Sequence, residues 1–201
     1  MSMLGSLLAG AVVAATPTTP LPWFDLNDYP IKAFEREWQG VTSFAVIVGP
    51  DGRAVDCKVV KSSGYEMLDR PACSVAVKRA RFRPAVGADG RAAYGVYRSQ
   101  VVWQRPDRDP PQRDLGPDLE VSISQMPAGA TSPGIELAYF VDADGNPSAC
   151  TALPDSAAQP PVLLDIACKA LFDKLAREPV TAKGVPVAAV KTAAVKVTAP
   201  K

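Results

Sequence analysis

The four cysteines of this chain fall into two pairs, and each pair sits in the same local pattern. In each half, the glycine of an Asp-Gly pair stands five residues before the first cysteine, and a proline stands eleven residues after the second. A Leu-Asp pair closely precedes the second cysteine in both halves. Several matched offsets rarely arise together by chance, so the pattern indicates an internal duplication of roughly 90 residues. The matching residues are Asp51, Gly52, Leu68, Asp69 and Pro84 in the first copy and Asp144, Gly145, Leu164, Asp165 and Pro179 in the second.

The duplication predicts one disulfide in each copy, because it aligns the cysteines in the same way. The expected bonds join Cys57 to Cys73 and Cys150 to Cys168. A redox role is disfavoured because no Cys-x-x-Cys motif is present. A zinc site is also disfavoured, because metal sites usually use closely spaced cysteine pairs. Structural disulfides persist in oxidising compartments, so they indicate an exported protein.

The N-terminal residues have the character of an export signal. An apolar run from Leu4 to Ala15 covers about 12 residues, whereas a spanning helix needs about 20. Small residues at Val13 and Ala15 suit the positions before a signal-peptidase cut, although no Lys or Arg precedes the run. We therefore predict that residues 1–22 are a signal peptide and linker, with mature protein beginning near Thr16. An uncleaved anchor and a disordered tail are the alternatives.

The patterns of apolar residues predict an α+β protein made of two small units, residues 23–105 and 118–201. Each unit is expected to have the order α-β-β-α-β, with a three-stranded antiparallel sheet packed on helices and one disulfide. Residues 106–117, rich in proline and charge, are the expected linker. In the first unit we expect a short helix after Pro30, strands 41–48, 53–61 and 94–103, and a helix over 67–80. In the second we expect strands 119–124, 135–141, 148–153 and 185–197 and a helix over 161–175, with no counterpart of the opening helix.

Composition argues against several functions. The net charge is +1 and the basic residues form no block, so nothing indicates nucleic acid or an anionic membrane surface. The chain has no histidine, which removes the commonest general base and metal ligand. The carboxylates of Asp51, Asp69 and Asp165 stand in turns or at helix starts, where capping explains them. Asp142–Asn146 resembles a calcium loop only faintly, because its glycine is misplaced. We therefore expect no enzyme activity, no metal, no cofactor and no small-molecule substrate.

Residues 26–104 resemble the TonB C-terminal domain family as an ordered set of short motifs. The set begins with Tyr29-Pro30 and Gly40-Val41 before the first strand, and continues with Asp51-Gly52 and the strand ending in Ser62-Ser63-Gly64. It is completed by Leu68-Asp69, Arg81-Phe82-Arg83-Pro84 and Asp89-Gly90. The second copy has Ala152-Leu153-Pro154 in place of Ser-Ser-Gly, so its membership rests on the internal repeat and it is the degenerate copy.

The resemblance implies a periplasmic protein that binds peptides of outer-membrane transporters or other envelope proteins by adding a strand to a sheet edge. It could thereby assist transport across the membrane. Coupling to a proton-driven motor in the inner membrane is not expected, because the sequence shows no long spacer and no membrane span of 20 residues. The alternative location is the periplasmic side of the inner membrane, which would require that the N-terminal segment stays uncleaved and anchors the protein. The alternative is a scaffold of the cell envelope, structural or accessory to secretion. The last strand of the first unit is the expected edge, with Tyr94, Val96, Tyr97, Ser99, Val101 and Trp103 as its partner-binding residues.

Overall fold

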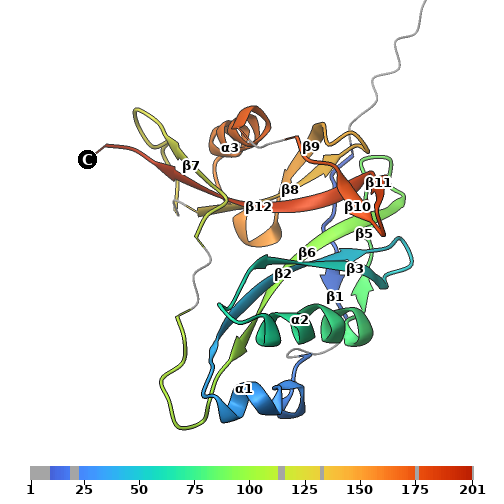
Figure 1. Cartoon of the computed structure of the whole chain (residues 1–201). Coiled ribbons are helices and arrows are strands. Elements are labelled where there is room, and N and C mark those ends of the chain that lie inside the picture. Colours follow the sequence, from blue (N-terminus) through green and yellow to red (C-terminus); the bar gives the residue numbers. More distant parts are fainter. Residues whose placement is uncertain (1–9, 19–22, 113–115, 132–133, 175–176, 201) are drawn as a thin grey trace, which may run out of the picture.

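A computed structural model describes residues 10–18, 23–112, 116–131, 134–174 and 177–200 of the chain. It contains two α+β units that follow one another along the sequence (Figure 1). In each unit, three antiparallel strands form a sheet against which one long helix packs, and one disulfide joins a strand to that helix. The predicted fold class is therefore confirmed.

The first unit begins with a short helical segment and ends with a long strand. Its helices are η1 (Leu26–Asp28), α1 (Ile31–Glu35) and α2 (Glu66–Arg79), and its strands are β2 (Gly40–Val48), β3 (Ala54–Lys61), β4 (Phe82–Arg83), β5 (Ala85–Val86) and β6 (Ala92–Trp103). A further short strand, β1 (Thr16–Pro17), precedes them. Helix α1 starts after Pro30 as predicted and ends at Glu35, because Glu37 adopts a left-handed φ of 58° that no continuing helix allows.

The second unit repeats this plan without the opening helix. Its strands are β7 (Leu119–Ser122), β8 (Gly134–Val141), β9 (Pro147–Ala152), β10 (Val180–Ala182), β11 (Val185–Val187) and β12 (Ala189–Thr198), and its helices are η2 (Pro154–Ser156) and α3 (Pro161–Lys174). A two-residue turn, Lys183-Gly184, lies between β10 and β11, with both residues at positive φ. The last residue of the predicted helix, Leu175, falls outside the described residues.

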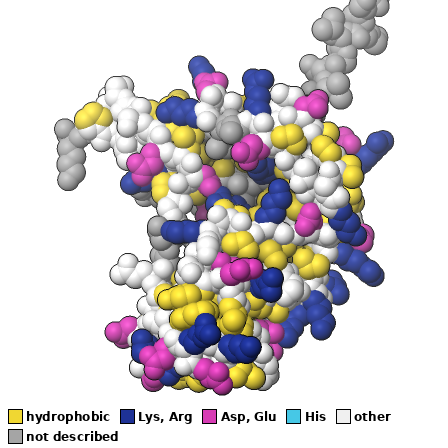
Figure 2. Space-filling view, in the orientation of Figure 1, with side chains coloured by type: hydrophobic (Ala, Val, Ile, Leu, Met, Phe, Trp, Pro, Cys, Tyr) yellow, Lys and Arg dark blue, Asp and Glu magenta, His cyan; other side chains and the backbone are white. Residues whose placement is uncertain are grey.

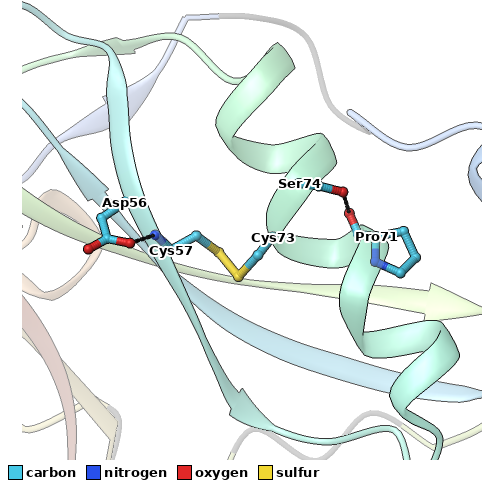
Figure 3. The surroundings of a disulfide bond; sticks show 5 residues. All are labelled: Asp56, Cys57, Pro71, Cys73 and Ser74. Atoms are coloured by element: carbon cyan, nitrogen blue, oxygen red, sulfur yellow. Dashed lines mark hydrogen bonds between the residues drawn. A yellow bond between two sulfur atoms is a disulfide. The ribbon is translucent and has the colours of Figure 1, made fainter. Parts of the chain in front are cut away.

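Both predicted disulfides are present. Cys57 on β3 is bonded to Cys73 on α2, with 5.4 Å between their Cα atoms (Figure 3). Cys150 on β9 is bonded to Cys168 on α3, with a Cα separation of 6.0 Å. The two bonds occupy equivalent positions in the two units, because each fastens the strand after the Asp-Gly turn to the long helix. This placement is the strongest structural support for the internal repeat.

The two three-stranded sheets are joined into one, which the sequence did not predict. The strand order is β3-β2-β6-β12-β8-β9, and the junction is a short parallel pairing of Tyr94 with Ala189 and Gly95 with Val190. Helices α2 and α3 lie on opposite sides of this joined sheet (Figure 1). Each unit ends in a strand that would otherwise present backbone N–H and C=O groups along an edge, so pairing the two strands satisfies part of both edges.

The two units also share their cores. Ile47 of β2 is buried in the cluster that packs under α3, whereas Ala138 of β8 and Val190 of β12 are buried in the cluster that packs under α2. A bulge in β3 contributes to this exchange, since the pairing of Ile47 with Asp56 and Val48 with Ala54 leaves Val55 without a partner in β2. The alternation of residues in this strand predicts Val55, Cys57 and Val59 on one face. That prediction is wrong, because the bulge turns Val55 towards the second unit while Cys57 faces α2.

Asp69 holds the start of α2 against the sheet. Its buried carboxylate accepts hydrogen bonds from the Thr42 hydroxyl at 2.8 Å, the Ser62 hydroxyl, and the Ser63 backbone N–H at 2.9 Å. The indole N–H of Trp103 donates in turn to the Thr42 hydroxyl at 3.0 Å. Burial raises the pKa of Asp69, but these hydrogen bonds outweigh it and hold the pKa below its usual range.

The second unit has no such carboxylate at the equivalent place. Counting back four residues from the helix cysteine leads to Asp69 in the first unit and to Leu164 in the second. Asp165 is therefore one residue out of register with Asp69, and its side chain is exposed. The Leu-Asp pairs of the two copies therefore do not occupy equivalent structural positions. The alignment of Asp165 with Asp69 in the predicted repeat is wrong.

Candidate peptide-binding edge

Strand β6, the predicted edge, lies inside the joined sheet. The prediction of a fully exposed edge is wrong at Tyr94, which pairs with Ala189 of β12. From Val96 to Trp103 the strand pairs with β2 on one side, and among the described residues no strand pairs with it on the other. An open stretch of edge thus remains, but it begins two residues later than expected and β12 flanks its start.

The side chains of the six predicted residues point into different surroundings. Val101 and Trp103 are buried in the core under α2, and Tyr94 packs against the core under α3. Tyr97 lies beside two aromatic rings, with centroid distances of 5.8 Å to Trp23 and 5.2 Å to Phe82. Only Val96, Tyr97 and Ser99 border open space on the side of β12. Any contact made by Val101 or Trp103 would have to use the backbone.

After the short junction, β6 and β12 diverge and leave a fork in the sheet. One cavity, of about 450 Å³, opens on the face that carries the N-terminal segment, and Tyr97 and Ser99 border it from β6. A second cavity, of about 360 Å³, opens on the other face, with Val96 bordering it from β6. Thr192 and Ala193 of β12 border both. Figure 2 shows a hollow between the two units, with basic and acidic side chains around it.

Arg98 and Asp118 close the open end of the fork, and neither was singled out in the sequence. Arg98 on β6 forms an ion pair with Asp118, which directly precedes β7. Asp118 is also fixed to β12, because its backbone N–H donates to Ala194 O at 2.8 Å and its carboxylate accepts from Ala194 N at 2.9 Å. No sequence signal could have found this pair, since the two residues meet only when the units assemble.

Two titratable groups line the second cavity with perturbed pKa values. Burial raises the pKa of Tyr139 to about 12, with a further contribution from the charge of Asp118. Burial lowers the pKa of Lys191, and the nearby Glu178 opposes that effect. The Lys191 ammonium lies 5.9 Å from the centre of the Tyr139 ring. This cavity therefore combines an apolar floor with charges of both signs.

Asp51 and Asp142, from the candidate catalytic and calcium-binding residues, stabilise the turns in which they stand. The Asp51 carboxylate accepts a hydrogen bond from the Arg53 N–H within its own turn, as a turn residue does. The Asp142 carboxylate likewise accepts from the backbone N–H groups of Asp144 and Asn146. Within the described ranges, no three His, Cys, Asp or Glu residues gather closely enough to hold a metal ion. Over the same ranges, no helix has the length and apolar character that crossing a membrane requires.

Comparison with protein-family models gives a match over the first unit. Residues 26–103 match the family model described as Gram-negative bacterial TonB protein C-terminal. These bounds run from the start of η1 to the end of β6, so the match covers the first unit and leaves the second outside it. No curated protein and no solved structure matches the chain.

Proposed function

Residues 26–103 belong to the TonB C-terminal domain family, and on that basis we propose that this chain is a periplasmic protein that binds extended peptides of outer-membrane transporters or other envelope proteins. Domains of this family are periplasmic in general and interact with outer-membrane proteins. The proposed activity is binding, with assistance to transport as its consequence, and not catalysis. The binding site is the open edge of β6 beginning at Val96.

The fork between β6 and β12 is the observation that carries the proposal. A strand laid along β6 in the plane of the sheet would point successive side chains to opposite faces. The two cavities lie on opposite faces of the fork, and Val96 and Tyr97 border one each. Backbone pairing with β6 would supply affinity, and the two cavities would select the side chains of the peptide. The mixed charges of Lys191 and Glu178 favour a polar side chain on the second face.

Entry of a peptide requires the Arg98–Asp118 ion pair to open. The side chains are 41% and 23% exposed, so the pair is partly solvated. Exposed ion pairs contribute about 0.2–1 kcal/mol, which is small beside the hydrogen bonds that a paired strand would form. The ion pair therefore acts as a weak closure that a peptide can displace.

The joined sheet also supports a second candidate, a scaffold of the cell envelope that binds no peptide. In that case the parallel pairing of β6 with β12 would serve only to hold the two units together. The two candidates differ in one measurable respect, which is whether the fork accepts an added strand.

Amide NMR of the full chain, titrated with synthetic peptides from the periplasmic segments of outer-membrane transporters, tests the proposal. We expect chemical-shift changes concentrated on residues 96–99 and 191–194. Shifts confined to other parts of the chain, or none at millimolar peptide, would favour the scaffold.

Two threonines on β12 offer a matched pair of variants. Thr192 borders both cavities, whereas Thr198 lies beyond the fork, where β12 pairs with Ser122 of β7. Thr192→Arg should fill the fork and abolish peptide binding, and Thr198→Arg should leave it unchanged. Equal effects of the two substitutions would contradict the proposed site.

A further inference from the structure

The described part of the N-terminal segment, residues 10–18, pairs with the folded first unit through a bridge at Val13 and the short strand β1. Val13 and Val86 exchange two backbone hydrogen bonds, each 2.9 Å long. Further along, Thr16 and Pro17 pair with β4, and the Thr18 N–H donates to Arg81 O at 2.7 Å. These pairings keep one antiparallel register from residue 13 to residue 18, since each step forward on one chain is a step back on the other. The segment therefore adds a strand to the outer side of β4 and β5.

The position that receives this strand is shaped for small side chains. A Cβ atom on Gly95 would lie 2.7 Å from the Cβ of Ala15, closer than real Cβ atoms approach, and 3.1 Å from that of Ala85, which is also tight. Glycine at 95 and alanine at 15 thus make room for one another. The side chains of Val12 and Ala15 are only 3% and 6% exposed, whereas Val13 between them is 51% exposed. The two buried side chains are three residues apart, so the segment departs from the two-residue alternation of a regular strand.

The segment also covers the second unit. Val12 and Ala15 belong to the same buried cluster as Ala138 and Val190, which lie on the face of the second sheet away from α3. Phe140 packs against this cluster as well. Removal of the segment would expose apolar surface of both units at their junction.

We propose that the edge formed by residues 81–86 is a strand-acceptor site for an extended, uncharged peptide with alanine at the buried position of Ala15. Residues 10–18 of this chain occupy the site in cis and carry no charge. The sequence predicts signal-peptidase cleavage near Thr16, which would take Val12 and Ala15 away and leave the inner half of the site vacant. A strand of the same character from a second polypeptide then fills it. The backbone partner here is Val86 and not β6, although Ala14, Ala15 and Thr16 also border the cavity beside Tyr97.

A variant lacking residues 1–18, mixed with a synthetic peptide of residues 10–18, tests this directly. The peptide should raise the melting temperature of the variant and return the Val86 and Gly95 amide resonances to their positions in the full chain. A peptide with Ala15→Trp should not bind, whereas one with Val13→Trp should bind as well as the natural sequence. Failure of the natural peptide to bind at millimolar concentration, or equal binding of both altered peptides, would overturn the proposal.

Amide hydrogen exchange in the full chain is a second test of the acceptor site, and it does not require the shortened variant to fold. The Val86 amide, which donates to Val13 O, should exchange slowly. Ala15→Trp should speed its exchange at least tenfold, and Val13→Trp should not. Fast exchange of Val86 in the unaltered chain would refute the acceptor site. The readout is separate from residues 96–99, so failure here leaves the proposed peptide-binding function to its own test.

Discussion

Replacing Asp69 with alanine should destabilise the first unit by about 2–4 kcal/mol. The carboxylate is 8% exposed and accepts three hydrogen bonds. The main cost falls on Thr42, which is fully buried and would keep the bond from Trp103 but lose its own acceptor. A buried donor without a partner costs about 1–3 kcal/mol, and the loss of the bond to Ser63 adds to it. The Ser62 hydroxyl is exposed and can turn to water, so its contribution is small.

Urea unfolding followed by tryptophan fluorescence measures this loss in the right unit. The three tryptophans of the chain, Trp23, Trp38 and Trp103, all belong to the first unit. Asp165→Ala is the matched control, because Asp165 also follows a leucine near the start of the long helix but is exposed. Circular dichroism should show that it changes the stability of the second unit by less than about 0.5 kcal/mol. If the two substitutions lowered the free energy of unfolding equally, or if Asp69→Ala lowered it negligibly, the structural role assigned to the Asp69 carboxylate would be refuted.

The same carboxylate should make the first unit sensitive to acid. The folded-state pKa of Asp69 is lowered, so its contribution to stability is present above the unfolded pKa of about 3.9 and disappears as the pH falls through the folded value. Asp69→Asn should therefore lower stability at neutral pH and flatten its decline below about pH 4. A decline as steep as in the unaltered chain would show that other groups cause it.

Three further outcomes follow from the structure. Replacing either disulfide with serines should cost about 3 kcal/mol in the chain-entropy model, measured by urea unfolding, and a loss below about 1 kcal/mol would contradict it. Asp118→Asn should raise peptide affinity a few-fold, measured by isothermal titration calorimetry, because it weakens the ion pair with Arg98 that closes the fork. The control is Glu120→Gln, which weakens the ion pair with Lys196 outside the fork and should leave the affinity unchanged. Tyr139 should contribute a loss of stability on the order of 2 kcal/mol between pH 10 and about 12, since its pKa is raised to about 12 in the folded state. Tyr139→Phe should reduce the alkaline fall measured by urea unfolding without removing it, because burial also raises the pKa values of Tyr29 and Tyr97.

Much of each unit could be predicted from the sequence alone. The offsets around the cysteines predicted the pairing of Cys57 with Cys73 and of Cys150 with Cys168, and the alternation of apolar residues located β2, β8 and both long helices. These features depend on the local periodicity of apolar residues and on an internal repeat, and both can be read from the sequence without the structure. The ordered motifs also identified the family of residues 26–103.

The Leu-Asp pairs misled about register within the repeat, although their spacing to the helix cysteine already differs by one residue in the sequence. The Leu-Asp pairs suggested that Asp165 stands where Asp69 does, yet helix α3 begins so that Leu164 takes that place. A shift of one residue on a helix turns a side chain by about 100°, which is enough to move a carboxylate from a buried network to solvent. Asp69 and Asp165 therefore have different structural roles, although each follows a leucine in its copy of the repeat.

The proposed binding site depends on the assembly of the two units. The sequence pointed to strand 94–103, but only the tertiary structure pairs Tyr94 with Ala189, opens the fork at Val96 and brings Asp118 to Arg98. It also paired residues 13–18, predicted from their composition to be export signal and linker, with residues 81–86. Strand edges bind through backbone groups that every residue carries, so the side chains along one edge do not specify which segment pairs with it. That choice depends on which surfaces the two folded units bury against each other.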